Sequence, residues 1–126
     1  APTSTAGRIA RIGEVASGFV YYVSVKGVTG SGHMDMDSVS AKVAEIKARI
    51  PLPVGVGFGI KDAETAARVA ALADAVIVGS AIVGRIEELA GAPGEIPGVI
   101  GDYLAGLRAA IDRADAAGAA PGGRDA

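Results

Sequence analysis

The chain has 126 residues, is half hydrophobic by composition and carries a net charge of −2, which suits one domain with a buried core and argues against nucleic acid or an anionic membrane as its main partner. It contains no cysteine, so disulfides and thiolate metal sites are excluded. No apolar stretch approaches the roughly 20 residues that span a bilayer, and no signal peptide is visible, so the cytoplasm is the expected compartment.

The first predicted helix follows a short turn-like lead-in, where Ser4 or Thr5 can cap it, and Gly18 stops it. Residues 19–25 form the first predicted strand. They are apolar on both faces and rich in β-branched and aromatic residues, which is typical of a strand buried in a parallel sheet between layers. A glycine-rich loop follows over 27–33.

The second predicted helix can be capped by Asp35, Asp37 or Ser38. Its apolar stripe consists of Val39, Val43, Ile46 and Ile50. Prolines end this helix, and residues 54–60 form the second strand with its exit loop. Asp62 is the expected cap of the third helix.

The remaining elements begin with a third buried strand, which runs over 75–80 into a short helix at 81–90. A linker over 91–98 precedes a last helix at 99–116. The apolar face of that helix is expected to consist of Ile100, Leu104, Leu107 and Ile111. Residues 116–126 read as a flexible tail rich in small residues, after one folded unit over residues 1–115.

Strands that alternate with helices at this spacing predict right-handed βαβ units, a parallel sheet and the α/β class. Three strands of the central type would leave two apolar sheet edges unpaired. The simplest remedy is a longer parent protein that supplies further strands. Self-association of two copies, edge to edge, is the alternative remedy.

All three predicted strands end in glycine-rich segments, at 27–30, 57–60 and 79–81. Ligands of parallel βα folds bind beyond the carboxyl ends of the strands. Glycines let backbone N–H groups surround an anion there, and Ser80 begins a helix, whose dipole favours a phosphate group. The alternative is that these glycines only form tight turns. Three successive strand ends with a serine at the last favour a phosphate site.

Three blocks carry a resemblance to a known family: YYVSVKGVTG at 21–30, PVGVGFGI at 53–60 and ADAVIVGSAIV at 73–83. In order and spacing they resemble the tryptophan synthase alpha chain family, over most of residues 1–115. The resemblance implies the C-terminal part, about three βα units, of a (β/α)8 TIM barrel. It implies a lyase that cleaves indole-3-glycerol phosphate to indole and glyceraldehyde 3-phosphate. The beta subunit partner carries pyridoxal phosphate, so no cofactor is expected in this chain.

The resemblance also implies roles for individual residues. The substrate phosphate would be bound by Gly30, Gly59, Gly79 and Ser80. Phe58 would contact the indole ring, Thr29 would sit in a closing loop, and Tyr21 would point from its strand into the pocket. Tyr22, on the opposite face of that strand, is expected in the core.

The cleavage needs a general base and a general acid, and the family places both carboxylates in the first half of the barrel, in a motif like E-L-G-x-P-F-S-D-P. Nothing in this sequence matches that motif, so the isolated chain is predicted to be inactive. The alternatives are a non-catalytic phosphate-binding fragment and another sugar-phosphate barrel enzyme. A metal site at His33, Asp35 and Asp37 is not expected, because a solvated loop histidine and a helix cap explain these residues better.

Overall fold

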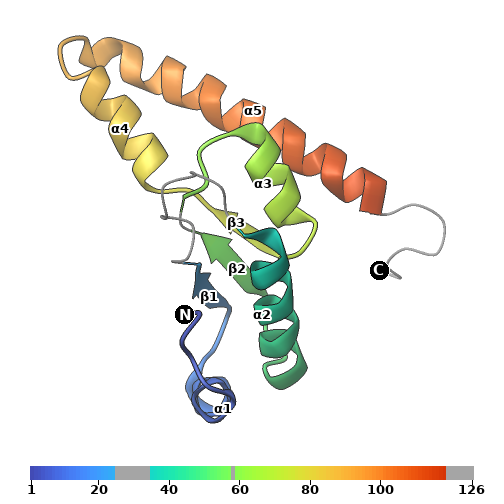
Figure 1. Ribbon diagram of the computed structural model, residues 1–126. Coiled ribbons are helices and arrows are strands. Elements are labelled where there is room, and N and C mark those ends of the chain that lie inside the picture. Colours follow the sequence, from blue (N-terminus) through green and yellow to red (C-terminus); the bar gives the residue numbers. More distant parts are fainter. Residues whose placement is uncertain (25–34, 58, 119–126) are drawn as a thin grey trace.

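The computed structural model describes residues 1–24, 35–57 and 59–118. Its centre is a sheet of three parallel strands in the order β1-β2-β3 (Figure 1). The strands are β1 (Val20–Val23), β2 (Val54–Gly57) and β3 (Ala75–Ile77). In their register, Tyr22 pairs with Val56, and Val56 pairs with Val76. The predicted α/β class with a parallel sheet is therefore confirmed.

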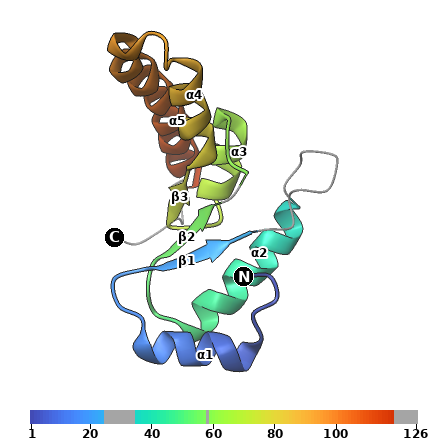
Figure 2. The same cartoon turned by 90° about the vertical axis from the view of Figure 1, so that its left-hand side faces the viewer.

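The described helices are α1 (Ala6–Val15), α2 (Met36–Arg49), α3 (Ala63–Ala70), α4 (Ser80–Glu88), the short 3-10 helix η2 (Pro93–Glu95) and α5 (Ile96–Gly118). Helices α2 and α3 pack on one face of the sheet, and α1 lies across one end of the molecule beside α2 (Figures 1 and 2). Helices α4 and α5 form a hairpin beyond β3, and α5 packs along α3. None of the helices in the described ranges has the length and apolar character needed to cross a bilayer.

Side-chain oxygens cap three of these helices, because each accepts a hydrogen bond from an N–H group in the first turn. The pairs are Thr5 with Arg8 (3.4 Å), Asp35 with Ser38 (3.2 Å) and Asp62 with Thr65 (2.7 Å). The caps predicted at Thr5 and Asp62 are confirmed. Among the three candidates for α2, the cap is Asp35, whereas Asp37 lies in the first turn, where the helix dipole favours a carboxylate.

The core lies between the sheet and the layer of α2 and α3. Val54, Val56 and Val69 are its largest fully buried side chains. The whole predicted stripe of α2 is buried, from Val39 to Ile50. Tyr22 belongs to the same core, as expected, and burial raises the pKa of its hydroxyl group.

The opposite face of the sheet is largely open, so the prediction that β1 and β3 are buried on both faces is wrong. Phe19 is 62% exposed and Tyr21 is 46% exposed, and Ala75 of β3 is also exposed. Among the three described strands, β2 alone is buried along its whole length, because the side chains of Tyr21 and Ile77 cover its two glycines. The apolar residues of these strands suit burial on both faces, but the described residues contain no second layer to cover this face.

Helix α5 differs from its prediction in start and in buried face. It begins at Ile96 rather than at 99, because Pro97 fits the first turn of a helix, where no N–H donor is needed. Its buried residues are Leu107 and Ala110, whereas Leu104 is 41% exposed. The helix packs against α3 with one side only, so part of the predicted apolar face stays open.

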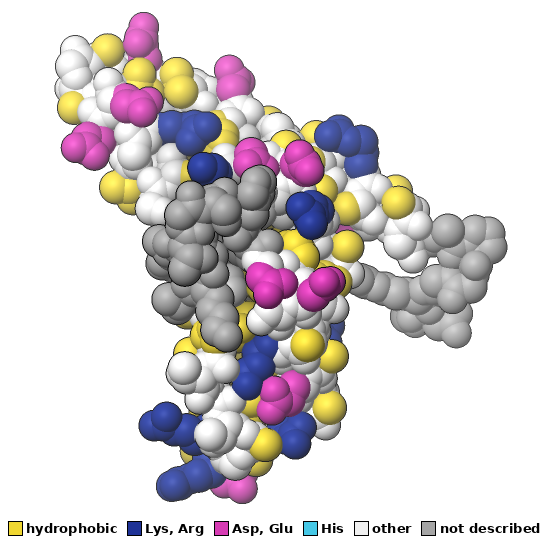
Figure 3. Space-filling view, in the orientation of Figure 1, with side chains coloured by type: hydrophobic (Ala, Val, Ile, Leu, Met, Phe, Trp, Pro, Cys, Tyr) yellow, Lys and Arg dark blue, Asp and Glu magenta, His cyan; other side chains and the backbone are white. Residues whose placement is uncertain are grey.

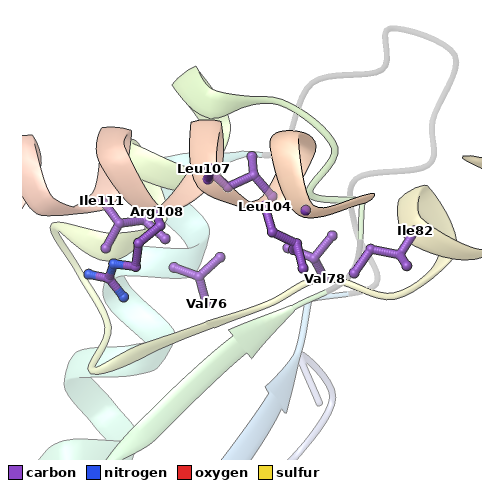
Figure 4. A pocket seen from close by; sticks show the side chains of 9 residues that line it. Val76, Val78, Ile82, Leu104, Leu107, Arg108 and Ile111 are labelled. Atoms are coloured by element: carbon purple, nitrogen blue, oxygen red, sulfur yellow. The ribbon is translucent and has the colours of Figure 1, made fainter. Parts of the chain in front are cut away.

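That open part lines an apolar groove of about 580 Å³ between β3 and α5. Figure 4 shows Val76 and Val78 on the strand side, opposite Leu104 and Ile111 of α5, with Ile82 of α4 at one end. Among the described strands, β3 pairs only with β2 and β1 pairs only with β2. The two outer strands therefore leave the open edges that the sequence predicts.

Asp74 joins the beginnings of β2 and β3. Its carboxylate accepts a hydrogen bond from the Val54 N–H group at 2.9 Å and lies 3.0 Å from Lys47 Nζ. We expect Asp74→Ala to lower the free energy of unfolding by about 1–3 kcal/mol, because a buried N–H group loses its partner. Lys47→Met, which removes only the partly exposed ion pair, should cost about 0.2–1 kcal/mol. Urea unfolding compares the two variants, and equal losses would show that the ion pair carries the effect.

Candidate phosphate site at the strand ends

The carboxyl ends of the three strands meet at one edge of the sheet. Gly57 at the end of β2 pairs with Val23 on one side and with Ile77 on the other. Ser24, just after β1, is buried and binds the Gly57 carbonyl group twice, through its hydroxyl group at 2.9 Å and its N–H group at 3.1 Å. The segments that leave β2 and β3 therefore start from neighbouring, fixed positions.

Gly59 forms the turn after β2. Its φ angle of 77° lies in the left-handed region, which favours glycine, and the space where a side chain would begin is open. The next residue, Ile60, is buried in the core, and Asp62 caps α3. The buried Ile60 side chain and the Asp62 cap thus hold the turn in place, while Gly59 itself is exposed.

The beginning of α4 is the second backbone segment at this edge. Gly79 is its N-cap, and no side chain caps the helix. The N–H groups of Ile82 and Val83 both donate to the Gly79 carbonyl group, at 2.9 and 3.2 Å. Helix geometry leaves the N–H groups of Ser80 and Ala81 without partners inside the helix. Together with the exposed Ser80 hydroxyl group and the helix dipole, they can accommodate an anion.

The side chains of Arg85 and Tyr103, which no sequence pattern indicated, connect these two segments. The Tyr103 hydroxyl group of α5 donates to the Lys61 carbonyl group at 2.7 Å. The Arg85 guanidinium group lies 3.6 Å from the centre of the Tyr103 ring and donates to the Ala81 carbonyl group at 3.1 Å. The spacing of Arg85 and Ala81 along a helix is visible in the sequence, but the partnership with Tyr103 depends on how α5 folds back.

The other predicted site residues are placed as follows. Tyr21 lies on the open face of the sheet, with its ring beside Gly57. Gly59, Gly79 and Ser80 lie at the carboxyl-end edge of the sheet, in the segments that follow β2 and β3. Thr29, Gly30 and Phe58 lie outside the described residues.

Carboxylates are not part of the described strand ends, since the last strand residues are Val23, Gly57 and Ile77. Within residues 1–24, 35–57 and 59–118, no three His, Asp or Glu side chains gather in a way that could hold a metal ion. His33, considered for a metal site with Asp35, lies outside those ranges. The described edge of the sheet therefore offers backbone N–H groups and a hydroxyl group, a set suited to binding an anion rather than to acid–base chemistry.

Known proteins are similar to this chain in sequence and in fold. The profile of the family described as tryptophan synthase alpha chain matches residues 1–96. The tryptophan synthase alpha chain of Burkholderia thailandensis is 56% identical over 114 residues, which are 90% of this chain and 41% of that protein. A solved tryptophan synthase subunit alpha from Legionella pneumophila is 38% identical with a TM-score of 0.75, covering 89% of this chain and 40% of its own. Tryptophan synthase from M. tuberculosis is 36% identical with a TM-score of 0.63, covering 85% of this chain and 38% of its own.

The chain thus spans 41% of the length of the Burkholderia relative and superimposes on a similar share of the solved alpha subunits. The resemblance carried by the three sequence blocks is confirmed, as is the interpretation of the fold as part of a TIM barrel. Because the family profile matches residues 1–96 of 126, well over half of the sequence, the chain belongs to the tryptophan synthase alpha chain family.

Proposed function

We propose that this chain supplies the phosphate-binding part of a lyase of the tryptophan synthase alpha type, which cleaves indole-3-glycerol phosphate to indole and glyceraldehyde 3-phosphate. The observation that carries the proposal is the beginning of α4, which no side chain caps, beside the Gly59 turn on the neighbouring strand. Gly59 and Ser80 are both exposed, and the strands that precede them pair at their carboxyl ends. A phosphate group would receive hydrogen bonds from Ser80, Ala81 and Gly59 there.

In this role the chain binds and orients the substrate, and the acid–base chemistry is left to carboxylates of another segment. The phosphate would be held by interactions that are the same before and during the reaction, so it serves to place the indole and glycerol parts correctly. Tyr21, which is exposed on the open face of the sheet, is the residue proposed to face that part. The beta subunit, which carries pyridoxal phosphate, is the proposed partner, and this chain needs no cofactor of its own.

The alternative is a non-catalytic phosphate-binding fragment. The described strand ends favour it in one respect, because they carry no carboxylate. The two functions agree on the phosphate site and differ in turnover. They can therefore be separated by supplying the missing portion of the barrel.

The experiment measures indole release from indole-3-glycerol phosphate by three samples: this chain, the remaining portion of the Burkholderia thailandensis relative, and their mixture. We expect no release from either part and release from the mixture, because the mixture joins the phosphate site to the carboxylates. Glycerol 3-phosphate binding to this chain is measured in parallel by NMR. Binding without release from the mixture would support the non-catalytic alternative, and release by this chain alone would contradict the predicted inactivity.

A further inference from the structure

The turn between β2 and α3 is held at three consecutive residues. The Ile60 side chain is buried in the core, the Lys61 carbonyl group accepts from the Tyr103 hydroxyl group, and Asp62 caps α3. The first packs in the core that the helices and strands share, and the third caps the helix that follows the turn. The hydrogen bond from Tyr103 connects the turn to α5, across 42 residues of sequence.

Tyr103 is connected in turn to the first residues of α4. The guanidinium group of Arg85 stacks on the Tyr103 ring and donates to the Ala81 carbonyl group, one turn back along α4. A continuous path therefore runs from Ala81 through Arg85 and Tyr103 to Lys61. We call this path the Arg85–Tyr103 tie. Both side chains are half-buried, and of the two hydrogen bonds in the tie the one from Arg85 is part-buried and the one from Tyr103 is exposed.

We propose that Arg85 and Tyr103 are positioning residues, which set the spacing between the Gly59 turn and the beginning of α4. The inference rests on the proposed phosphate site. It adds two residues that hold the anion-binding backbone segments in place and do not themselves contact the anion. A phosphate group must accept hydrogen bonds from both segments at once, so their separation decides how many bonds it receives. Segments held in place before binding lose less entropy when the ligand arrives.

Arg85 adds a positive charge beside the first turn of α4, where its guanidinium group binds the Ala81 carbonyl group. Figure 3 shows Lys and Arg side chains, interspersed with acidic ones, over the part of the surface where α3, α4 and α5 lie. Charge alone would make Lys an adequate substitute for Arg85. If Arg85 acts by positioning, Lys cannot replace it, because an ammonium group lacks the flat shape that stacks on the Tyr103 ring while it also binds a carbonyl group.

The test titrates the whole chain, four single variants and one double variant with inorganic phosphate, followed by the amide resonances of Gly59 and Ala81. Tyr103→Phe removes one hydroxyl group and keeps the ring. Arg85→Lys keeps the charge, and Arg85→Met removes it. Arg108→Met is the matched control, since it removes a guanidinium group that pairs with Asp112 on the same hairpin. The thermal midpoint of each variant shows that it is folded at the temperature of the titration.

We expect Tyr103→Phe and Arg85→Lys each to weaken phosphate binding about three- to tenfold, the effect of one net hydrogen bond. Arg85→Met should weaken it further, and Arg108→Met should leave it unchanged. A Tyr103→Phe/Arg85→Lys double variant should lose little more than either single one, because both changes break one path. Such coupling would not arise from two unrelated losses of stability.

The outcomes separate the inference from the function on which it rests. An unmodified chain that does not bind phosphate overturns the proposed site and the role of the tie together. Phosphate binding that is equally strong in the unmodified chain, Tyr103→Phe and Arg85→Lys overturns the tie alone. Losses that are fully additive in the double variant would likewise show that the two residues do not act as one path.

Discussion

Replacing Ser80 with aspartate is expected to stabilise the fold and to abolish phosphate binding at the same time. Ser80 is the first residue of α4, and Gly79 before it offers no side chain to cap the helix. A carboxylate in the first turn interacts favourably with the helix dipole, which should raise the free energy of unfolding by about 0.3–1 kcal/mol. The same carboxylate would occupy the place of the anion and repel it.

Like charges in direct contact cost several kcal/mol, so the phosphate affinity should fall at least about 100-fold. Ser80→Ala, which removes only the hydroxyl group, should lose about two- to tenfold. Ser17→Asp is the charge control, because it makes the same substitution in the exposed turn that precedes β1. Urea unfolding and phosphate titration are measured on all three. A Ser80→Asp chain that still binds phosphate as the unmodified chain does would show that the anion lies elsewhere.

Gly57→Ala is expected to destabilise the fold by about 1–3 kcal/mol, the usual cost of forcing a methyl group into packed surroundings. A Cβ atom at Gly57 would lie 2.8 Å from the Tyr21 hydroxyl oxygen and 2.9 Å from Ile77 Cβ. Ile77 Cβ is attached to the backbone of β3 and cannot move without shifting the strand. The Tyr21 ring would also be pushed away from the sheet, so the variant should change its fluorescence.

Two glycine substitutions serve as controls for that prediction. Gly55→Ala would meet Ile77 Cδ1 at 2.9 Å, the free end of a flexible side chain, so it should cost less than Gly57→Ala. Gly106→Ala, on α5, would meet nothing within 4 Å, and should stabilise the chain by roughly 0.5–1 kcal/mol because alanine favours a helix. Urea unfolding ranks the three variants. A Gly57→Ala chain as stable as Gly55→Ala would contradict the close packing around Gly57.

The elements that local chemistry determines were predictable from the sequence. Thr5 and Asp62 act as caps because the oxygen of a short side chain just before a helix can accept a hydrogen bond from an N–H group of its first turn. This bond does not depend on where the helix lies in the fold. The stripe from Val39 to Ile50 is buried as a whole because its period matches one helix face. The parallel sheet followed from the alternation of strands and helices.

Features that depend on distant segments were not predictable in the same way. Whether Tyr21 or Tyr22 is exposed depends on which face of the sheet another layer covers, and a run of apolar residues looks the same in both cases. The tie from Arg85 through Tyr103 to Lys61 requires α5 to fold back along α3, which no local pattern encodes. At the candidate site, strand-end chemistry predicts the glycines and Ser80, and these stay predictions. The sequence did not indicate Ser24, because a serine after an apolar strand looks unremarkable.

The order of the strands has a consequence for how the chain folds. Each strand pairs with the one nearest to it in sequence, so the sheet grows from one side as β1, β2 and β3 follow each other. The contacts that join neighbouring units close loops of moderate length: Ser24 and Gly57 are 33 positions apart in the sequence, and Val54 and Asp74 are 20 positions apart. Loops of this size close with a modest entropic penalty. Each βα unit can therefore dock on the one before it during synthesis, and α5, which follows α3 and α4 in the sequence, then packs against both.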